Sequence, residues 1–335
     1  MSPRSKPAAQ AEFQALQPDD ILSATDSVGQ RGDGRLLALN SYENRVYRVG
    51  MEDGPPLVAK FYRPGRWSNE EILEEHRFAQ ELADDEIPVV PPLVFGDRTL
   101  HEHGPFRFAL YACHGGHPPP LDDTVLLRQL GRLVGRIHQR GAREDFELRP
   151  EISIEDYGIA SCEYLLEEGF IPADVTPAYE SICEHLFTAM EHCHERSGDV
   201  SLIRLHGDFH PGNVLVLDTR VHIVDLDDAR MGPRVQDLWM LLSGDREEQM
   251  PQLAELLAGY NEFGRFDARE LHLIEALRTL RIMHYSAWLA RRWQDPAFPI
   301  AFPWFNTHRY WDEHVQSLKE QLALMQEEPL EWLPA

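Results

Sequence analysis

Three oxygen-bearing side chains in one short segment have the types and the spacing that phosphoryl transfer requires. Residues 204–230 read RLHGDFHPGNVLVLDTRVHIVDLDDAR, with apolar runs around the polar positions. Asp208 and Asn213 lie on one predicted tight loop, because a proline and a glycine between them oppose regular structure. Asp225 follows the second apolar run. In phosphoryl transfer one acid orients the acceptor hydroxyl, while an asparagine and an aspartate hold metal on the phosphate. We therefore expect Asp208 to be the catalytic carboxylate, free at the apex of its loop to accept a proton.

A short hairpin must position the metal ligands. Residues 214–217 and 221–224 are apolar runs on either side of a short turn, which predicts two paired strands. A hairpin returns the chain to its starting point, so Asp225 should come beside Asn213. One carboxylate and one amide oxygen make a hard-ligand site for Mg²⁺, which takes further oxygens from phosphates and water. The predicted cofactors are therefore ATP and Mg²⁺.

The first third of the chain must grip the phosphates. Lys60 ends a predicted strand in LVAKF, where its ammonium is expected to hold the α- and β-phosphates. Its acid partner should lie on the following helix. Glu75 is the preferred partner, with Glu71 and Glu74 as alternatives. Glu71 is already engaged if it forms a capping box with Ser68.

No glycine-rich loop precedes Lys60, since the corresponding turn reads NSYENRVY. Backbone amides of this turn, together with Ser41 and Asn44, are expected to cover the phosphates. The residues expected to contact the adenine are Tyr111, Ala112 and Cys113.

Supporting roles are predicted for three further residues. His206 is expected to tie the catalytic loop to neighbouring backbone. Asp227 is either a second metal ligand or a brace for its own loop. Asp237 either caps its helix or bonds back to the backbone of the catalytic loop. Both alternatives for Asp237 are structural roles.

The surrounding elements are predicted from hydrophobic periodicity and turn residues. The expected strands are 35–39, 45–49, 57–62, 89–95 and 106–111, with a helix from about 69 to 83. A breaker cluster, CHGGHPPP, marks a boundary at 113–120. The expected helices beyond it are 125–137, 177–196, 235–242, 249–263, 268–291 and 307–325. The segment 291–305 has too many prolines for a helix and is expected to form a wall of the acceptor groove.

This pattern predicts an α+β fold with two lobes, which, together with the phosphoryl-transfer residues, resembles a protein kinase-like fold. Residues 1–20 are expected to be a mobile tail. Residues 21–112 are expected to form a small β-rich N-lobe, and residues 113–335 a large helical C-lobe that carries the catalytic loop and the metal site.

Composition limits the possible partners. The formal net charge is −24, and basic residues form no stripe, so neither nucleic acid nor an anionic membrane is an expected partner. No apolar run reaches the roughly 20 residues of a membrane-spanning helix, and no secretory segment is apparent. The four cysteines show no CxxC pairing and are expected to be free thiols in a reducing cytoplasm. A monomer is expected.

The motifs resemble a known superfamily. H-G-D-x-x-x-x-N and the later D-L-D differ from the H-R-D and D-F-G of eukaryotic protein kinases, and are similar to those of the aminoglycoside phosphotransferase and choline kinase-like superfamily. Five stretches resemble the bacterial stress response kinase A group (the YihE/RdoA type), with similarity from about residue 20 to 325. The five stretches are LNSYENRVY, KFYRPGRW, ILEEH, HGDFHPGN and VDLDDARMGPRVQDLWMLL.

This resemblance implies a cytoplasmic, ATP- and Mg²⁺-dependent kinase of the stress response. Such a kinase phosphorylates Ser/Thr of proteins and also itself, so the chain would be a phosphoprotein. The protein substrate comes from the resemblance alone.

Three alternatives stay open. The first is a small-molecule kinase acting on homoserine, choline or an aminoglycoside; a cationic acceptor would suit so acidic a chain. The second is a metal-dependent hydrolase that uses His206, Asp208 and His210 as ligands. The third is a non-catalytic nucleotide-binding module, which is disfavoured because Lys60, Asp208, Asn213 and Asp225 are all present.

Overall fold

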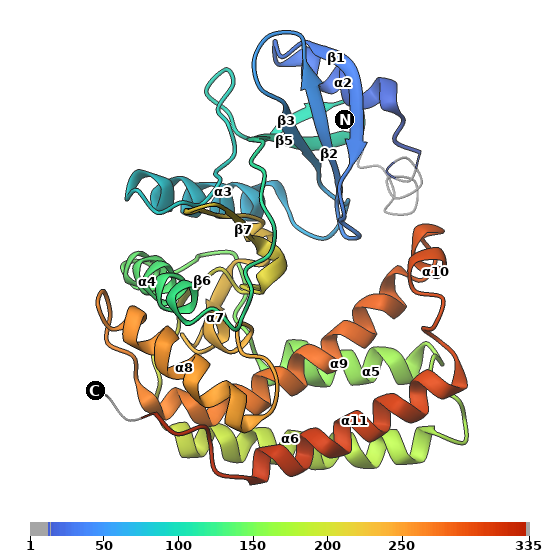
Figure 1. Cartoon of the computed structure of the whole chain (residues 1–335). Coiled ribbons are helices and arrows are strands. Elements are labelled where there is room, and N and C mark those ends of the chain that lie inside the picture. Colours follow the sequence, from blue (N-terminus) through green and yellow to red (C-terminus); the bar gives the residue numbers. More distant parts are fainter. Residues whose placement is uncertain (1–12, 14, 333–335) are drawn as a thin grey trace. The chain divides into compact units, whose positions relative to one another are not determined.

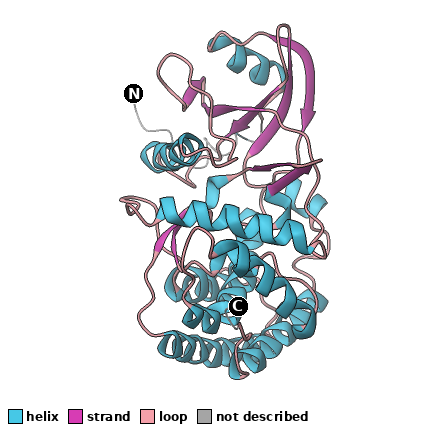
Figure 2. Cartoon of the chain, turned by 60° about the vertical axis from the view of Figure 1, so that its left-hand side comes forward, coloured by secondary structure: helices cyan, strands magenta, loops and turns pink. Residues whose placement is uncertain are grey.

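An antiparallel sheet is the framework of the first of two units in this computed structural model, which describes residue 13 and residues 15–332. Unit 1 is built from residues 1–119, 146–149 and 211–229, and unit 2 from residues 120–145, 150–210 and 230–335. The elements are labelled in Figure 1 and coloured by type in Figure 2.

The sheet of unit 1 has the order β1-β2-β3-β5-β4, and neighbouring strands are antiparallel. Its strands are β1 (Gly32–Ala38), β2 (Arg45–Met51), β3 (Leu57–Phe61), β4 (His101–His103) and β5 (Phe106–Ala112). Alternate residues of a strand point to opposite faces, and one face carries Val49, Ala59, Phe61, Phe108 and Leu110, all fully buried. The predicted strands 35–39, 45–49, 57–62 and 106–111 are confirmed to within a few residues.

Helix α2 (Pro18–Ser27) packs on this sheet through Ile21 and Ala24. It begins inside the segment 1–20 that was expected to be a tail. Phe13 is also buried, with 2% of its surface exposed, and joins the same core. The prediction for residues 1–12 and 14 lies outside the described residues.

Helix α3 (Asn69–Asp84) follows β3 and begins with the predicted capping box. The Ser68 hydroxyl accepts a hydrogen bond from the Glu71 N–H (3.1 Å), and the Glu71 carboxylate accepts one from the Ser68 N–H (2.6 Å). These two bonds satisfy donors that a helix start otherwise leaves unpaired. The buried face of α3 carries Glu74 and Glu75 among apolar residues, so both acids are held inside unit 1.

The expected strand at 89–95 is wrong. The segment makes isolated bridges through Val89, Pro92 and Phe95 instead of a continuous ladder. Three prolines at 88, 91 and 92 lack the N–H groups that a strand donates, so pairing is interrupted. The Val90 N–H still donates to the Ile223 carbonyl at 2.9 Å.

The predicted hairpin is present and belongs to unit 1. Strands β7 (Val214–Leu217) and β8 (Arg220–Ile223) pair in antiparallel register. Short 3₁₀ turns flank them, η2 at Pro211–Asn213 and η3 at Leu226–Asp228. The hairpin therefore places both of its ends in the unit that also holds β3 and α3.

Unit 2 is mostly helical, as Figure 2 shows. Its longer helices are α4 (Thr124–Gly141), α6 (Thr176–Ser197), α8 (Arg246–Tyr260), α9 (Ile274–Arg292) and α11 (His308–Gln326). The shorter elements are η1 (Glu155–Ile159), α5 (Ala160–Glu167), α7 (Gln236–Trp239), η4 (Ala268–Leu273), α10 (Ala297–Ala301), and the strand pair β6 (Ile203–Leu205) and β9 (Arg230–Gly232). A core between α5, α6, α9 and α11 includes the fully buried Tyr179, Leu186, Met283 and Trp311. No helix among the described residues has the length and apolarity needed to cross a bilayer.

Three helix predictions in unit 2 are corrected. The expected helix 268–291 begins as the 3₁₀ segment η4 before α9, and the expected helix 235–242 shortens to α7. The expectation that 291–305 contains no helix is wrong, because α10 forms there. Pro299 lies in the first turn of α10, where a backbone N–H has no partner within the helix in any case.

Candidate active site

Lys60 and Asp225 meet within unit 1, although 165 positions separate them in the sequence. The Lys60 ammonium donates to Asp225 Oδ1 at 2.8 Å and lies 3.1 Å from Asp227 Oδ1. Burial alone would lower the pKa of Lys60, but the two carboxylates outweigh burial and place it well above its usual value. The predicted phosphate grip and the predicted metal ligand therefore form one charged cluster.

The hairpin positions Asp225 beside Asn213 at the level of the backbone. The Val224 N–H donates to the Asn213 carbonyl at 3.0 Å, which closes the hairpin one residue before Asp225. Asp225 itself has φ +62°, a left-handed conformation that costs an ordinary residue about 1 kcal/mol or more. Half of its side-chain surface is exposed, so the carboxylate is accessible to a ligand.

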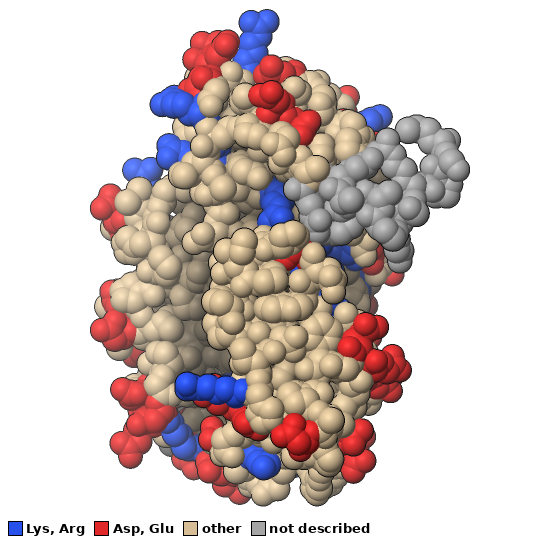
Figure 3. All heavy atoms as spheres, turned by 90° about the vertical axis from the view of Figure 1, so that its right-hand side faces the viewer, with Lys and Arg blue, Asp and Glu red and all other residues tan. Residues whose placement is uncertain are grey.

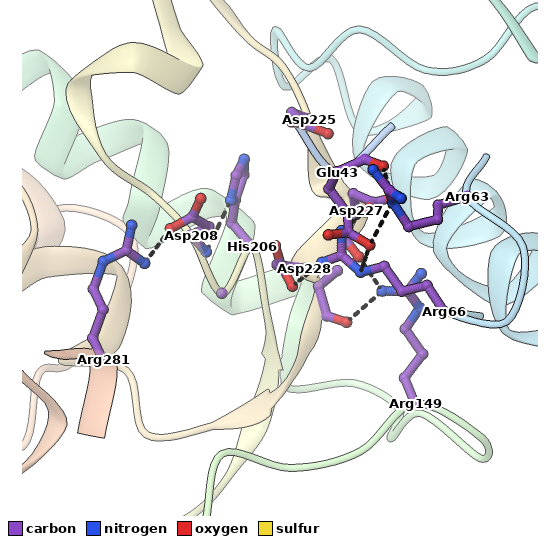
Figure 4. A network of polar contacts seen from close by, with 12 residues as sticks. Glu43, Arg63, Arg66, Arg149, His206, Asp208, Asp225, Asp227, Asp228 and Arg281 are labelled. Carbon is purple, nitrogen blue, oxygen red and sulfur yellow. Dashed lines mark hydrogen bonds and ion pairs between the residues drawn. The ribbon is translucent and has the colours of Figure 1, made fainter. Parts of the chain in front are cut away.

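Asp227 is contacted by cations from outside its own loop. Its side chain is 3% exposed, and Arg66 lies 2.7 Å from Asp227 Oδ2. Burial opposes ionisation of Asp227, but Lys60 and Arg66 together lower its pKa to about 2. Arg66 also donates to Asp228 Oδ1 at 2.7 Å, as Figure 4 shows. Asp227 is therefore a buried anion whose charge is balanced by two cations.

Arg149 fixes the backbone of the same loop. Its guanidinium donates to the carbonyls of Asp227 (2.7 Å) and Ala229 (3.0 Å), and to the Glu71 carbonyl of α3 (3.0 Å). Glu74 accepts hydrogen bonds from the backbone N–H groups of residues 147–149, at 2.6 to 3.1 Å for the shortest bond to each. Glu74 and Arg149 thus join α3 to the loop after β8.

Glu75 does not pair with Lys60 through a hydrogen bond. Its Oε2 has no hydrogen-bond partner among the residues that the structure describes, and lies 3.8 Å from His76 Nε2. Burial raises the pKa of Glu75 to about 7, and the charges of Lys60 and Arg149 oppose this shift only in part. Of the three candidate acids on α3, Glu71 caps the helix and Glu74 binds the 147–149 segment. Glu75 therefore stays the candidate partner of Lys60, on which it acts through its charge and not through a hydrogen bond.

Hydrogen bonds from Arg63 hold the loop between β1 and β2. The buried Arg63 side chain donates to the carbonyls of Glu43 (2.7 Å) and Tyr42 (3.0 Å), and its backbone N–H donates to Asn44 Oδ1 (3.1 Å). The Asn44 side-chain oxygen is therefore used as a brace of the loop. Ser41 is half-buried in the same loop, where it keeps its predicted role over the phosphates as an untested prediction.

The predicted adenine segment follows the end of β5. The Tyr111 hydroxyl hydrogen-bonds to the Tyr62 hydroxyl (2.9 Å), and Ala112 is the last residue of the strand. Cys113 is a half-buried free thiol. Beyond it, His117 exchanges two backbone hydrogen bonds with Val216 of β7, at 3.0 and 2.9 Å. The segment therefore runs from the sheet to the hairpin within unit 1.

Asp208 belongs to unit 2. The expectation that its carboxylate is free is wrong, because it is paired. Arg281 of α9 donates a hydrogen bond to Asp208 Oδ1, and His210 Nε2 lies 3.4 Å from Asp208 Oδ2. The carboxylate retains 22% exposure, and Figure 4 shows it facing the end of the Arg281 side chain. A paired carboxylate has a fixed orientation, which a residue that positions an acceptor hydroxyl needs.

Asp237 bonds back to the catalytic loop, as one of the two predicted alternatives states. Its carboxylate accepts from the His206 N–H (2.8 Å) and the Gly207 N–H (2.9 Å), and lies 3.2 Å from His138 Nε2. Gly207 has φ +83°, which residues other than glycine rarely adopt. The glycine at this position lets two consecutive N–H groups reach one carboxylate. His206 lies inside this network, and its Nδ1 is 3.4 Å from the Asp208 N–H.

The residues present suit a divalent cation held in part by phosphate. Among residues 13 and 15–332, no three His, Cys, Asp or Glu side chains gather as a metal site. Asn213 and the half-exposed Asp225 would supply hard oxygen donors, and phosphate and water oxygens would complete the coordination of Mg²⁺. This donor set fits a cation that arrives with a nucleotide.

The comparisons with known proteins place the chain in a family. Residues 35–273 match the family model described as phosphotransferase enzyme family, APH. This chain belongs to the APH phosphotransferase family. The chain is 44% identical to stress response kinase A of Escherichia coli K12 over 322 residues, which are 96% of this chain and 97% of that protein. The APH family member is accordingly a kinase.

Two further relatives indicate what this phosphotransferase resembles. A protein of Salmonella typhimurium named serine/threonine protein kinase RdoA is 42% identical over 96% of this chain and 97% of its own length. The solved structure of amicoumacin kinase hAmiN in complex with AMP-PNP, Ca²⁺ and Ami has a TM-score of 0.72, with 18% identity over 96% of this chain and 97% of that one. The α+β, protein kinase-like fold expected from the sequence is therefore confirmed.

Sequence patterns did not reveal the arginines of the site. Arg66, Arg149 and Arg281 bind Asp227, its loop and Asp208, yet none stands in a motif with a known chemical role. Arg66 lies in the family-like stretch KFYRPGRW, which was the one available signal. The partners of Arg149 and Arg281 are 73 to 80 positions away, so local patterns carry no information about them.

Proposed function

We propose that this chain is an ATP- and Mg²⁺-dependent protein kinase that phosphorylates Ser/Thr residues, including its own. The ion pair of 2.8 Å between Lys60 and Asp225 carries the proposal, because it joins the phosphate grip to the metal ligand. The protein acceptor is supported by the name of the Salmonella relative, serine/threonine protein kinase RdoA.

The proposed roles follow from the chemistry of each group. Lys60 holds the α- and β-phosphates, and Asn213 and Asp225 hold the metal. Bound Mg²⁺ would neutralise charge on the transferring phosphate. Asp208 accepts the proton of the acceptor hydroxyl as that oxygen bonds to the γ-phosphorus. The bond from the γ-phosphorus to the oxygen bridging to the β-phosphate breaks, and ADP leaves.

The decisive experiment compares acceptors side by side. Purified protein is incubated with labelled ATP and Mg²⁺, either with a generic Ser/Thr-containing protein or with a panel of amino alcohols, homoserine and aminoglycosides. We expect label in the protein acceptor and in the chain itself, as phosphoserine or phosphothreonine. Asp208→Asn serves as the inactive control. Label that enters the small molecules and no protein would overturn the proposed acceptor class.

A small-molecule kinase is the second candidate, since a protein of the same fold is named amicoumacin kinase. That likeness, at 18% identity, shows the fold alone. The panel above separates the two candidates, because each acceptor is scored with the same ATP and the same metal.

We further expect the kinase to act in the cytoplasm as a monomer. Cell fractionation and sedimentation of the purified chain test these two expectations. Recovery in a membrane or periplasmic fraction, or a concentration-independent dimer, would contradict them.

A further inference from the structure

A pocket of about 420 Å³ in unit 2 is lined in part by Arg281, the residue that pairs with Asp208. The other lining residues that matter here are Trp239, Arg278, Tyr285, Tyr310 and Glu313. An acceptor whose hydroxyl reaches Asp208 would extend along Arg281 toward this pocket. The chemistry of the pocket then selects the acceptor.

Arg281 has hydrogen-bond donors to spare. A guanidinium carries five N–H donors, and the Asp208 carboxylate accepts from Nη1. No other acceptor for Arg281 exists among the described residues, and 43% of its side chain is exposed. The remaining donors match a carboxylate or phosphate, which arginine can bind through two parallel hydrogen bonds.

Arg278 supplies a second cation one helical turn earlier on α9. Its guanidinium lies 5.3 Å from the centre of the Trp239 ring, which holds the side chain in place. The nearest acid is Glu275 at 3.6 Å, and the Arg278 Nε is buried without a hydrogen-bond partner in the described part of the chain. Arg278 lines the pocket and 23% of its side chain is exposed, so it adds a second positive charge there.

The acids around the pocket are already paired. Glu313 accepts a hydrogen bond of 2.7 Å from Arg309, and Glu275 faces Arg278. The net charge of −24 acts mainly at long range, and Figure 3 shows acidic side chains spread over the face that it presents. Salt screens such charges beyond about 8 Å under physiological conditions, whereas a direct contact with arginine is much less screened.

We propose that Arg278 and Arg281 form a subsite for an acidic side chain of the acceptor, close in sequence to the Ser or Thr that is phosphorylated. This inference rests on the proposed function, which it narrows to an acidic peptide as the substrate class. Arg281 then has two roles, since one side of its guanidinium binds Asp208 and the other binds the acceptor. A cationic amine would meet two arginines at this subsite and is selected against.

The test uses the full-length protein and three serine peptides of equal length, flanked by Glu, by Gln or by Lys. Phosphorylation is measured as kcat/KM, and peptide binding is measured separately by calorimetry, which requires no transfer. The variants are Arg278→Gln and Arg281→Gln. Arg132→Gln is the matched control, because Arg132 is 42% exposed, pairs with one acid, Glu262, and does not line the pocket.

We expect wild type and Arg132→Gln to prefer the Glu-flanked peptide over the Lys-flanked one by about 10-fold or more, the size expected of a charge-assisted hydrogen bond. Arg281→Gln and Arg278→Gln should each reduce this preference in both binding and kcat/KM. Equal use of the three peptides, or a preference that survives both substitutions, overturns the subsite and leaves the protein kinase intact. Binding that favours the Lys-flanked peptide overturns it as well. Transfer to amino alcohols alone overturns both the subsite and the proposed acceptor.

Discussion

The carboxylates of unit 1 and the catalytic loop of unit 2 are held in opposite ways. In unit 1, buried cations from distant parts of the chain surround Asp227, which is 3% exposed. In unit 2, Asp208 pairs with an arginine that is 43% exposed, while backbone N–H groups fix its loop on Asp237. The proposed metal side therefore holds a buried carboxylate between cations, whereas the arginine on the proposed acceptor side stays accessible. A kinase that uses one nucleotide and selects among acceptors is expected to differ in this way.

Substitution of the proposed metal ligand Asp225 and of the proposed catalytic carboxylate Asp208 should distinguish the two units most strongly. Asparagine tolerates the left-handed conformation of residue 225, so Asp225→Asn removes charge without added backbone strain. We expect it to reduce transfer by about 10³-fold or more and to weaken Mg·ATP binding. Asp208→Asn should reduce transfer by about 10²–10⁴-fold.

The two variants must differ in nucleotide binding for the comparison to hold. Calorimetry with Mg·ATP should give an unchanged affinity for Asp208→Asn and a lower one for Asp225→Asn. Equal affinities would remove the division between a metal side and an acceptor side. Circular dichroism checks that both variants are folded.

Asp237→Ala should cause the largest loss of stability. It leaves two N–H groups in the buried loop without their acceptor, at a cost of about 2–5 kcal/mol. Asp123→Ala is the matched control, because Asp123 also accepts from two backbone N–H groups but caps α4 at an exposed position. Loss of such a cap costs about 1 kcal/mol.

Denaturant unfolding followed by tryptophan fluorescence measures both variants. Six of the seven tryptophans, all except Trp67, belong to unit 2, so the signal reports on the unit that contains Asp237. Equal destabilisation by the two substitutions would show that burial of the catalytic loop adds nothing to its attachment.

Glu75 should make the stability of unit 1 depend on pH. Its pKa rises from 4.5 to about 7 because it is buried, so the folded protein holds this proton more tightly than the unfolded chain. The stabilisation is complete below about pH 4.5 and is lost as the pH rises through about 7. Glu75→Gln should remove this loss, worth at most about 3 kcal/mol.

The measurement is the unfolding free energy of wild type and Glu75→Gln between pH 5 and 8. Wild type should lose stability relative to the variant as the pH rises. Glu70→Gln, on the exposed side of the same helix, is the control and should follow wild type. Parallel curves for all three proteins would mean that Glu75 is solvated.

Asp228→Asn should have the smallest effect. Its side chain is 33% exposed and meets Arg66 at 2.7 Å, and pairs in such a setting contribute at most about 1 kcal/mol. Asp227→Asn removes the buried partner of the same arginine and should destabilise unit 1 more. The two unfolding free energies are measured in the same denaturant series. The reverse order would indicate that exposure does not decide which acid matters.

The sequence predicted those elements whose interacting residues lie close together in the chain. The capping box of Ser68 and Glu71 and the hairpin at 214–223 were both visible as short patterns, and the bond from Asp237 to the catalytic loop was one of two alternatives. The prediction of a strand at 89–95 was wrong because it relied on the apolar content of the segment and ignored the N–H groups that its prolines lack. Hydrophobicity identifies buried segments, but backbone donors decide whether they pair.

The partners of the site could not be predicted in the same way. Lys60 was expected to pair with an acid on the following helix and instead bonds to Asp225. Asp208 was expected to be free but binds Arg281. Each of these contacts depends on how distant elements pack. An arginine has no local sequence signature for the carboxylate that it will meet, whereas a capping residue meets its partner three positions away.

The composition of unit 1 has a consequence for how the chain is made. The five-stranded sheet and α3 are translated before residue 119, but residues 211–229 belong to the same unit. At about 5–20 residues per second, the stretch from 119 to 229 takes on the order of 5–20 s to synthesise. Until then Lys60 and Arg66 lack Asp225 and Asp227. The nascent N-terminal part therefore lacks two of the carboxylates that pair with these cations until the hairpin is translated.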